Sequence, residues 1–116
     1  MREPQTILDQ IFDISKSVRY VALYRDGNLV SRQREELAGA SANESDRYEE
    51  LFVNPTLLTL VRQRGNVDCG GAQFVVVRYG NFYQLVIALN DGHVSVCFEL
   101  SANPLEYAER IRGICE

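Results

Sequence analysis

The chain has 116 residues, of which 46% are hydrophobic and 24% are charged, as in ordinary globular domains that bury their own core. Its formal net charge of −4 argues against a nucleic-acid-binding surface. Cys69, Cys97 and Cys115 form no C-x-x-C pair and are odd in number, which indicates reduced thiols rather than a secreted disulfide scaffold. No apolar run approaches the ~20 residues that span a bilayer, and the polar N-terminal stretch lacks a signal-peptide core. We therefore expect a single domain over residues 1–116, soluble and cytoplasmic.

The N-terminal third of the chain predicts a helix followed by a hairpin. Apolar residues recur at helical spacing over residues 4–16, and Pro4 suits the first helical turn. Residues 18–33 alternate apolar and polar on both sides of Asp26-Gly27, a dipeptide typical of two-residue hairpin turns. The small and polar residues 34–45 predict a loop.

A second helix is predicted to begin near Ser45, with a proline inside it. Pro55 lacks an amide donor, so we expect it either to kink the helix or to divide it into two, with Asn54 capping the second part. The glycine-rich residues 64–71 predict a connector. The apolar residues of this helix fall into two groups, Tyr48, Leu51 and Phe52 before the proline and Leu57, Leu58, Leu60 and Val61 after it.

Three strands and a final helix are predicted for the rest of the chain. The strands cover residues 73–79, 82–89 and 93–100, with turns at Gly80-Asn81 and Asp91-Gly92. Asn103 is a suitable cap for the last helix, and Pro104 suits its first position. The expected buried stripe of this helix is Leu105, Ala108, Ile111 and Cys115.

The predicted fold class is α+β, a single five-stranded antiparallel sheet with element order α-β-β-α-β-β-β-α. Residues 74–89 are apolar on both faces of their predicted hairpin, whereas a sheet with one wet face alternates apolar and polar residues. We therefore expect helices on both faces, with the middle helix opposite the two terminal ones.

The strand 73–79 is predicted to lie at an edge of this sheet. A long apolar edge invites another chain, and Arg78 is the charge that would blunt it here. Pairing with a second copy would satisfy the backbone and bury Val75 and Val77 in a two-fold homodimer. The alternative is that the connector after the second helix covers this edge within one chain.

The element order and two segments of the sequence resemble the Roadblock/LC7 family over nearly the whole chain. These segments are "VRYVALYRDGNLVSR" and "GGAQFVVVRYGNFYQLVIAL", which are followed by the closing helix. The resemblance implies a non-catalytic dimer that binds or regulates small Ras-like GTPases or assembles larger complexes. It also implies an interface of paired third strands and packed second helices, here Leu51, Leu58, Val61, Val75 and Val77. The chain departs from the family at Pro55 and in its long 34–45 loop, and the GTPase-binding face is unassigned.

No catalytic, cofactor or metal site is predicted. Gly65 and Gly70 have phosphate-loop spacing, but the lysine and hydroxyl residue that a phosphate loop needs are missing. His93 is the single histidine and is interpreted as a surface turn residue that cannot build a metal site alone. A nucleophile–base pair of Cys69 and His93 has no supporting sequence context. Cys97 is interpreted as a small buried hydrophobe.

Charged clusters are interpreted first as solvated surface. Glu44, Asp46, Glu49 and Glu50 suit the positive end of the second helix, and as an alternative they form a patch for an arginine-rich partner. Arg25, Arg32 and Arg34 are expected to form a solvated rim on the first hairpin.

A second function class stays open beside the dimer. A profilin-like sensor domain would bind a small ligand beside the sheet. A buried cavity near Tyr20, Tyr24 and Tyr83 would favour this reading.

Overall fold

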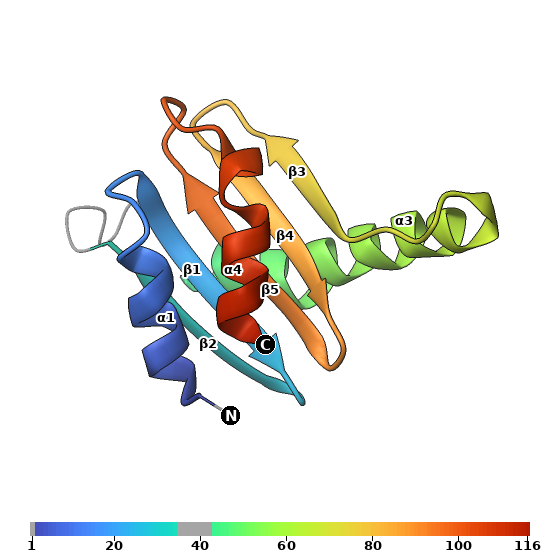
Figure 1. Cartoon of the computed structure of the whole chain (residues 1–116). Helices are drawn as coiled ribbons and strands as arrows, with labels where there is room; N and C mark the ends of the chain where they lie inside the picture. Colours follow the sequence, from blue (N-terminus) through green and yellow to red (C-terminus); the bar gives the residue numbers. More distant parts are fainter. Residues whose placement is uncertain (1, 35–42) are drawn as a thin grey trace.

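The computed structural model describes residues 2–34 and 43–116 as one five-stranded antiparallel sheet with helices on both faces (Figure 1). The strand order is β2-β1-β5-β4-β3. The predicted α+β class and order of elements are confirmed. The elements are α1 (Pro4–Phe12), β1 (Val18–Arg25), β2 (Asn28–Gln33), α2 (Asn43–Tyr48), the π-helix η2 (Glu49–Val53), α3 (Asn54–Asp68), β3 (Phe74–Arg78), β4 (Tyr83–Leu89), β5 (Gly92–Phe98), the 3-10 turn η3 (Pro104–Glu106) and α4 (Ala108–Cys115).

The β1–β2 hairpin forms as predicted around Asp26 and Gly27. Their φ angles of 51° and 83° are both positive, as a tight turn between antiparallel strands requires. β1 then pairs with β5, which carries the hairpin into the middle of the sheet. A local two-residue signal therefore sets the register of β2 against β1.

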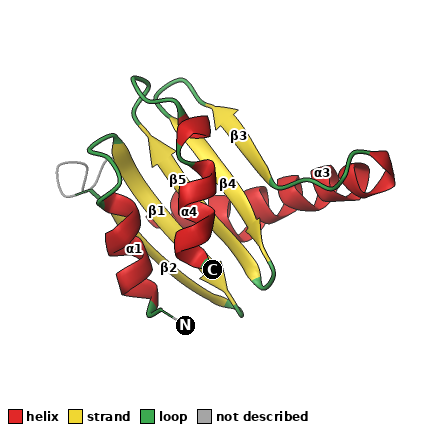
Figure 2. Cartoon of the chain, in the orientation of Figure 1, coloured by secondary structure: helices red, strands yellow, loops and turns green. Residues whose placement is uncertain are grey.

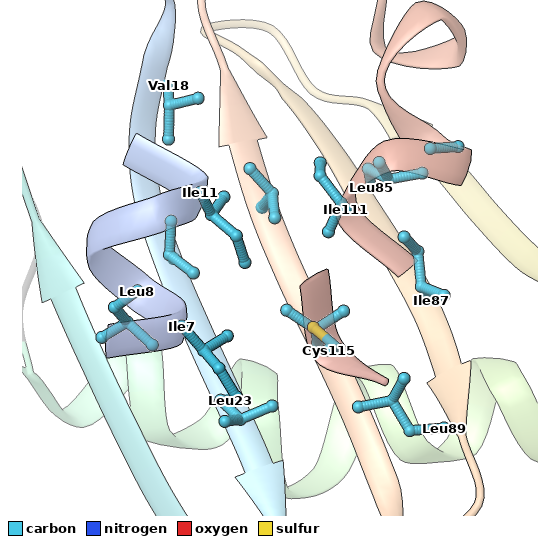
Figure 3. Packing of buried hydrophobic residues seen from close by; sticks show 14 of the residues in the cluster. Ile7, Leu8, Ile11, Val18, Leu23, Leu85, Ile87, Leu89, Ile111 and Cys115 are labelled. Carbon is cyan, nitrogen blue, oxygen red and sulfur yellow. The ribbon is translucent and has the colours of Figure 1, made fainter. Parts of the chain in front are cut away.

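The first face of the sheet is apolar and is covered by α1 and α4 (Figure 2). Figure 3 shows how side chains of both helices lie against those of β1 and β4. Burial of this cluster is the main hydrophobic contribution to folding on this side. Its fully buried members include Ile7, Leu8 and Ile11 of α1, Val21 and Leu23 of β1, Leu85 and Ile87 of β4, Val94, Val96 and Phe98 of β5, and Ile111 of α4.

The buried stripe predicted for the last helix is correct except at its first residue. Ala108, Ile111 and Cys115 are buried, whereas Leu105 is 61% exposed. Leu105 lies in η3, the 3-10 turn before α4, so the α-helical period used for the prediction does not apply to it. Asn103 caps this turn as expected, because its side chain accepts a hydrogen bond from the Leu105 amide at 3.2 Å.

The opposite face is covered by α2, η2 and α3, which follow one another without a break (Figure 1). Of the two alternatives expected at Pro55, a kink or a division into two helices, the division does not occur, since Tyr48, Val53 and Asn54 all keep right-handed helical angles. At the end of η2 the backbone N–H of Asn54 donates a hydrogen bond to the Glu49 carbonyl, five residues earlier in the chain. This wider π turn lets the helix continue through Pro55, which has no backbone N–H to donate. Asn54 is therefore not a cap, and its side chain has another partner.

α3 continues to Asp68, so the first part of the predicted 64–71 connector is helical. The chain reverses at Gly70 and Gly71, whose φ angles are 79° and 87°. The amides of Cys69 and Gly71 both donate to the Gly65 carbonyl at 3.0 Å and close the helix end. Of the predicted 34–45 loop, residues 35–42 lie outside the described part of the chain, and α2 begins already at Asn43.

β3 lies at the edge of the sheet, as predicted, with β4 as its neighbour. Hydrogen bonds to β4 join Ala88 N to Gln73 O at 3.2 Å and Tyr79 N to Phe82 O at 2.9 Å. Along an antiparallel strand, the N–H and C=O groups of successive residues point alternately toward one neighbouring strand and toward the other side. Since Gln73 and Tyr79 bond to β4, the odd-numbered residues of β3, Val75 and Val77, also bond to β4. The N–H and C=O groups of Phe74, Val76 and Arg78 therefore point away from the sheet.

Within residues 2–34 and 43–116, no helix has the length and apolar character that crossing a membrane requires.

Candidate functional site

A buried pair of polar side chains joins the second helix layer to the sheet. The Nε2 atom of His93 lies 2.8 Å from Oε1 of Glu50, and the two residues are 2% and 0% exposed. The Asn54 side-chain amide donates to the same oxygen at 2.9 Å. Glu50 comes from η2 and His93 from β5, so the contact ties the π-helical turn to the middle of the sheet.

The prediction that His93 is a surface turn residue is therefore wrong. His93 is the second residue of β5 and faces the helix layer, where its ring lies 5.7 Å from that of Tyr24. β5 begins at Gly92, one residue earlier than the predicted strand, so His93 lies within the strand and not in the turn. The dipole interpretation also fails for Glu50, because that carboxyl group is fully buried and bonded to His93 and Asn54.

The face beneath the helix carries a second buried polar contact, in which Gln84 donates from Nε2 to the Ser95 hydroxyl at 2.6 Å. Within the described ranges, three buried polar atoms beside these contacts have no hydrogen-bond partner. They are Oε2 of Glu50, Oδ1 of Asn54 and Oε1 of Gln84. Buried acceptors of this kind are normally satisfied, so this face is unusual for a monomer core.

A cavity of about 370 Å³ opens between η2 and the sheet. Glu49 and Glu50 line its helix side, while Tyr20, Gln84 and Cys97 line its sheet side. This is a cavity beside the sheet of the kind that a small-ligand domain needs, and Tyr20 lines it as expected. Tyr24 and Tyr83 are not among its lining residues.

Aromatic and acidic groups dominate one wall of the cavity. The Tyr79 hydroxyl donates to Oε1 of Glu49 at 2.9 Å, and the Tyr79 ring lies 5.2 Å from that of Phe82. Burial raises the pKa of Glu49, although the hydrogen bond from Tyr79 opposes this shift. Burial, with the negative charges of Glu50 and Asp46, also raises the pKa of Tyr20. Burial and neighbouring acidic groups thus act in the same direction on the pKa values of Tyr20 and Glu49 at this wall.

The three cysteines are free and occupy different environments. Cys97 is buried as predicted, and burial raises the pKa of its thiol well above the usual value. Burial raises the pKa of the Cys115 thiol to about 11. Cys69 is exposed at the end of α3, where its thiol donates to Asp68 at 3.4 Å, whereas His93 is buried and bound to Glu50. The conceivable nucleophile–base pair of Cys69 and His93 therefore does not form.

The arginines predicted as a solvated rim are all paired. Arg25 binds Asp91 at 3.1 Å and Arg32 binds Asp9 at 2.7 Å. Arg34 binds Glu99 at 2.8 Å, and Arg19 binds the same carboxylate at 3.1 Å. Partial burial raises the pKa of Glu99, but these two guanidinium groups outweigh it and hold the pKa below its usual value. In the described part of the chain, no group of three or more His, Cys, Asp or Glu residues is placed to hold a metal ion.

The residues predicted for a dimer interface lie on β3 and in the second helix layer, with different exposures. Val75 and Val77 are half-buried on β3, as are Leu51 of η2 and Val61 of α3. Leu58 is buried within its own chain, at 5% exposure. Of the apolar residues named from the sequence in this helix layer, Tyr48, Phe52 and Leu60 are exposed, at 61%, 61% and 60%. Val67, which the sequence pattern did not mark, is 76% exposed.

Searches against models of known protein families and against curated proteins find no match to the chain.

The Glu50–His93 contact gives a test by double-mutant cycle. His93→Leu leaves the Glu50 carboxyl group buried without its main partner, so we expect it to lower the free energy of unfolding by about 3–5 kcal/mol. The double variant with Glu50→Leu should lose about 1–3 kcal/mol less than the sum of the single changes. Urea unfolding of the four proteins measures this coupling.

The exposed ion pair of Arg64 and Asp68 serves as the control for this cycle. Its atoms lie 2.6 Å apart, but both side chains are about two-thirds exposed, at 66% and 67%. The same cycle there should give a coupling below about 0.5 kcal/mol. Equal coupling at both sites would contradict the role given to the buried pair.

Proposed function

We propose that this chain is a protein-interaction domain that forms a two-fold homodimer by pairing β3 with β3 of a second copy. The observation that carries this proposal is the open backbone of Phe74, Val76 and Arg78 at the sheet edge. Unpaired strand edges are usually blunted by charge, proline or a bulge. β3 has the sequence FVVVR, with one charge at its end, and it pairs regularly with β4. The strand is therefore fit to pair on both sides.

A two-fold axis at Val76 would pair all the outward backbone groups of this edge. Antiparallel pairing centred there sets Phe74 of one copy opposite Arg78 of the other, so the outward groups of all three residues find partners. The two sheets then continue as one sheet of ten strands. Such a contact uses the same patch on both copies, as in the commonest oligomer symmetry.

α3 adds an apolar surface beside this edge. It extends past β3, as Figure 1 shows, and carries Leu60 and Val67 on one helical face seven residues apart. These side chains are 60% and 76% exposed. Apolar surface of this kind beside a free strand edge is typical of an interface. Sheet pairing brings the second copy's α3 to the same side, where the two helices can cover each other.

The function proposed for the dimer is to regulate or scaffold a small Ras-like GTPase in the cytoplasm, without catalysis of its own. Its support is the resemblance of the sequence to the Roadblock family. The three thiols are compatible with a reducing compartment, because none of them forms a disulfide.

Changing the edge backbone tests the dimer. Val76→Pro removes an amide that points away from β4, so the monomer fold should survive while the dimer dissociates. Val76→Ala is the matched control, since it shortens the same side chain and keeps the amide. Light scattering during size exclusion should give a dimer mass for the native chain and for Val76→Ala, and a monomer mass for Val76→Pro. A monomeric native chain at all concentrations would sink the proposal.

The helix surface is tested separately with two leucines of equal exposure. Leu60→Lys places a charge in the proposed α3 contact and should weaken dimerisation by about tenfold or more. Leu105→Lys is the control, because Leu105 is 61% exposed but lies in η3, away from β3. Sedimentation over a concentration series measures both dissociation constants. Equal effects of the two changes would remove α3 from the interface.

The GTPase role is tested with purified Ras-like GTPases loaded with GDP or a non-hydrolysable GTP analogue. We expect one nucleotide state to bind the native dimer and the Val76→Ala variant, and to bind Val76→Pro at least about tenfold more weakly. Biolayer interferometry gives these affinities. A confirmed dimer that binds no member of the panel would contradict the GTPase role and leave the dimer intact.

A further inference from the structure

The cavity between η2 and the sheet has features of a ligand site that the dimer does not use. Its rim includes the exposed residues Ser45 and Asn81, and its walls include the partly buried Glu49 and the buried Gln84. Its volume of about 370 Å³ falls in the range of small-molecule pockets, about 300–1,000 Å³. The geometry points to a binding site for a small organic cation, an alkyl ammonium or a guanidinium.

The walls of the cavity offer unused hydrogen-bond acceptors. Glu50 and Gln84 are 0% and 2% exposed and both line the cavity. Oε2 of Glu50 and Oε1 of Gln84 have no hydrogen-bond partner among residues 2–34 and 43–116, while the opposite atoms of both side chains are bonded within the protein. The unused atoms of these two side chains are thus acceptors, and the buried Tyr20 hydroxyl of the same lining can donate or accept. A ligand that brings N–H donors would satisfy them, whereas a ligand of acceptors would leave them unpaired.

The lining of the cavity is also acidic. Three carboxyl groups line the cavity, from Asp46, Glu49 and Glu50. Arg19, the one cation among the described lining residues, already binds both oxygens of Glu99 at 3.1 Å. The carboxyl groups of Glu49 and Glu50, which accept hydrogen bonds from Tyr79 and Asn54, make this wall acidic, and an acidic wall favours a cation over an anion.

The cavity wall is also partly aromatic. Tyr20, Tyr79 and Phe82 all contribute to the cavity wall. Aromatic faces attract ammonium and guanidinium groups, and Arg19 already lies over Phe82 at 5.8 Å from the ring centre. A neutral ligand of the same size would not gain this interaction.

The local backbone agrees with a ligand-binding role. Glu49 and Glu50 begin the π-helical segment, and both line the cavity. Segments of this kind are rare and occur frequently at functional sites, because the widened turn re-aims side chains. Here the π-helical turn places the Glu50 carboxyl group against His93 and the Glu49 carboxyl group against the Tyr79 hydroxyl, both at the cavity wall.

The test uses agmatine, which carries a guanidinium and an ammonium group on a four-carbon chain. Calorimetric titration of the full chain should give a Kd of about 1 mM or tighter for agmatine. The neutral 1,4-butanediol and the anionic glutarate should bind at least about tenfold more weakly, because they lack the positive charge. Equal or better binding of either compound would overturn the proposal, and so would no binding of agmatine.

Two matched variants localise the binding. Glu49→Gln removes one charge from the cavity and keeps an oxygen for the Tyr79 hydroxyl, so the fold should be retained. It should weaken agmatine binding by about tenfold. Glu109→Gln makes the same change on α4, outside the cavity, and should leave the affinity unchanged. Equal weakening by both variants, or none by Glu49→Gln, would show that the cation binds elsewhere and overturn the assignment.

Discussion

The hydrogen bond between Glu50 and His93 fixes the position of the long helical layer on the second face of the sheet. On the first face, α1 and α4 are held by an apolar cluster that needs no particular polar contact. On the second face, the buried residues of α3 are Asn54, Leu58 and Gly65, which offer little apolar area. A buried polar pair adds little net stability compared with apolar packing, but leaving one partner alone is costly. The pair therefore selects one placement of the helix over others.

Both proposed functions depend on this placement, at opposite ends of the helical layer. At its N-terminal end, the π-helical turn sets Glu49 and Glu50 against the sheet and encloses the cavity. At its C-terminal end, α3 extends beyond β3, and this helix carries the exposed side chains of Leu60 and Val67. A helix that ended at Pro55 would lack the α3 surface, and the π turn just before Pro55 is the segment that sets Glu49 and Glu50 at the cavity. The continuous π-to-α path is thus the structural basis of the cavity and of the proposed interface.

Local signals in the sequence were sufficient for most of the fold. Asp26-Gly27 defines the first hairpin because its backbone angles suit few other residues, and the apolar period of α1 marks the face that packs. The edge position of β3 followed from the order of elements, since a hairpin and a three-stranded meander join through β1 and β5.

The candidate site was harder to predict because it depends on contacts between distant segments. Glu50 and His93 are 43 residues apart, and each has an ordinary explanation when taken alone, as a helix-start acid and as a turn residue. Pro55 gives a reliable signal against an α-helical hydrogen bond but no signal for the π turn that avoids the loss. Leu105 shows the same limit, since one turn of 3-10 geometry moved it from the expected buried stripe to the surface.

Amide hydrogen exchange along β3 tests most directly whether this strand pairs with a second copy. The Val75 and Val77 amides face β4 and should be protected at any protein concentration. The Phe74, Val76 and Arg78 amides face the open edge, so pairing predicts that their protection rises with protein concentration. If these three amides exchange rapidly even in concentrated solution, while Val75 and Val77 stay protected, β3 is a free edge and the dimer is wrong.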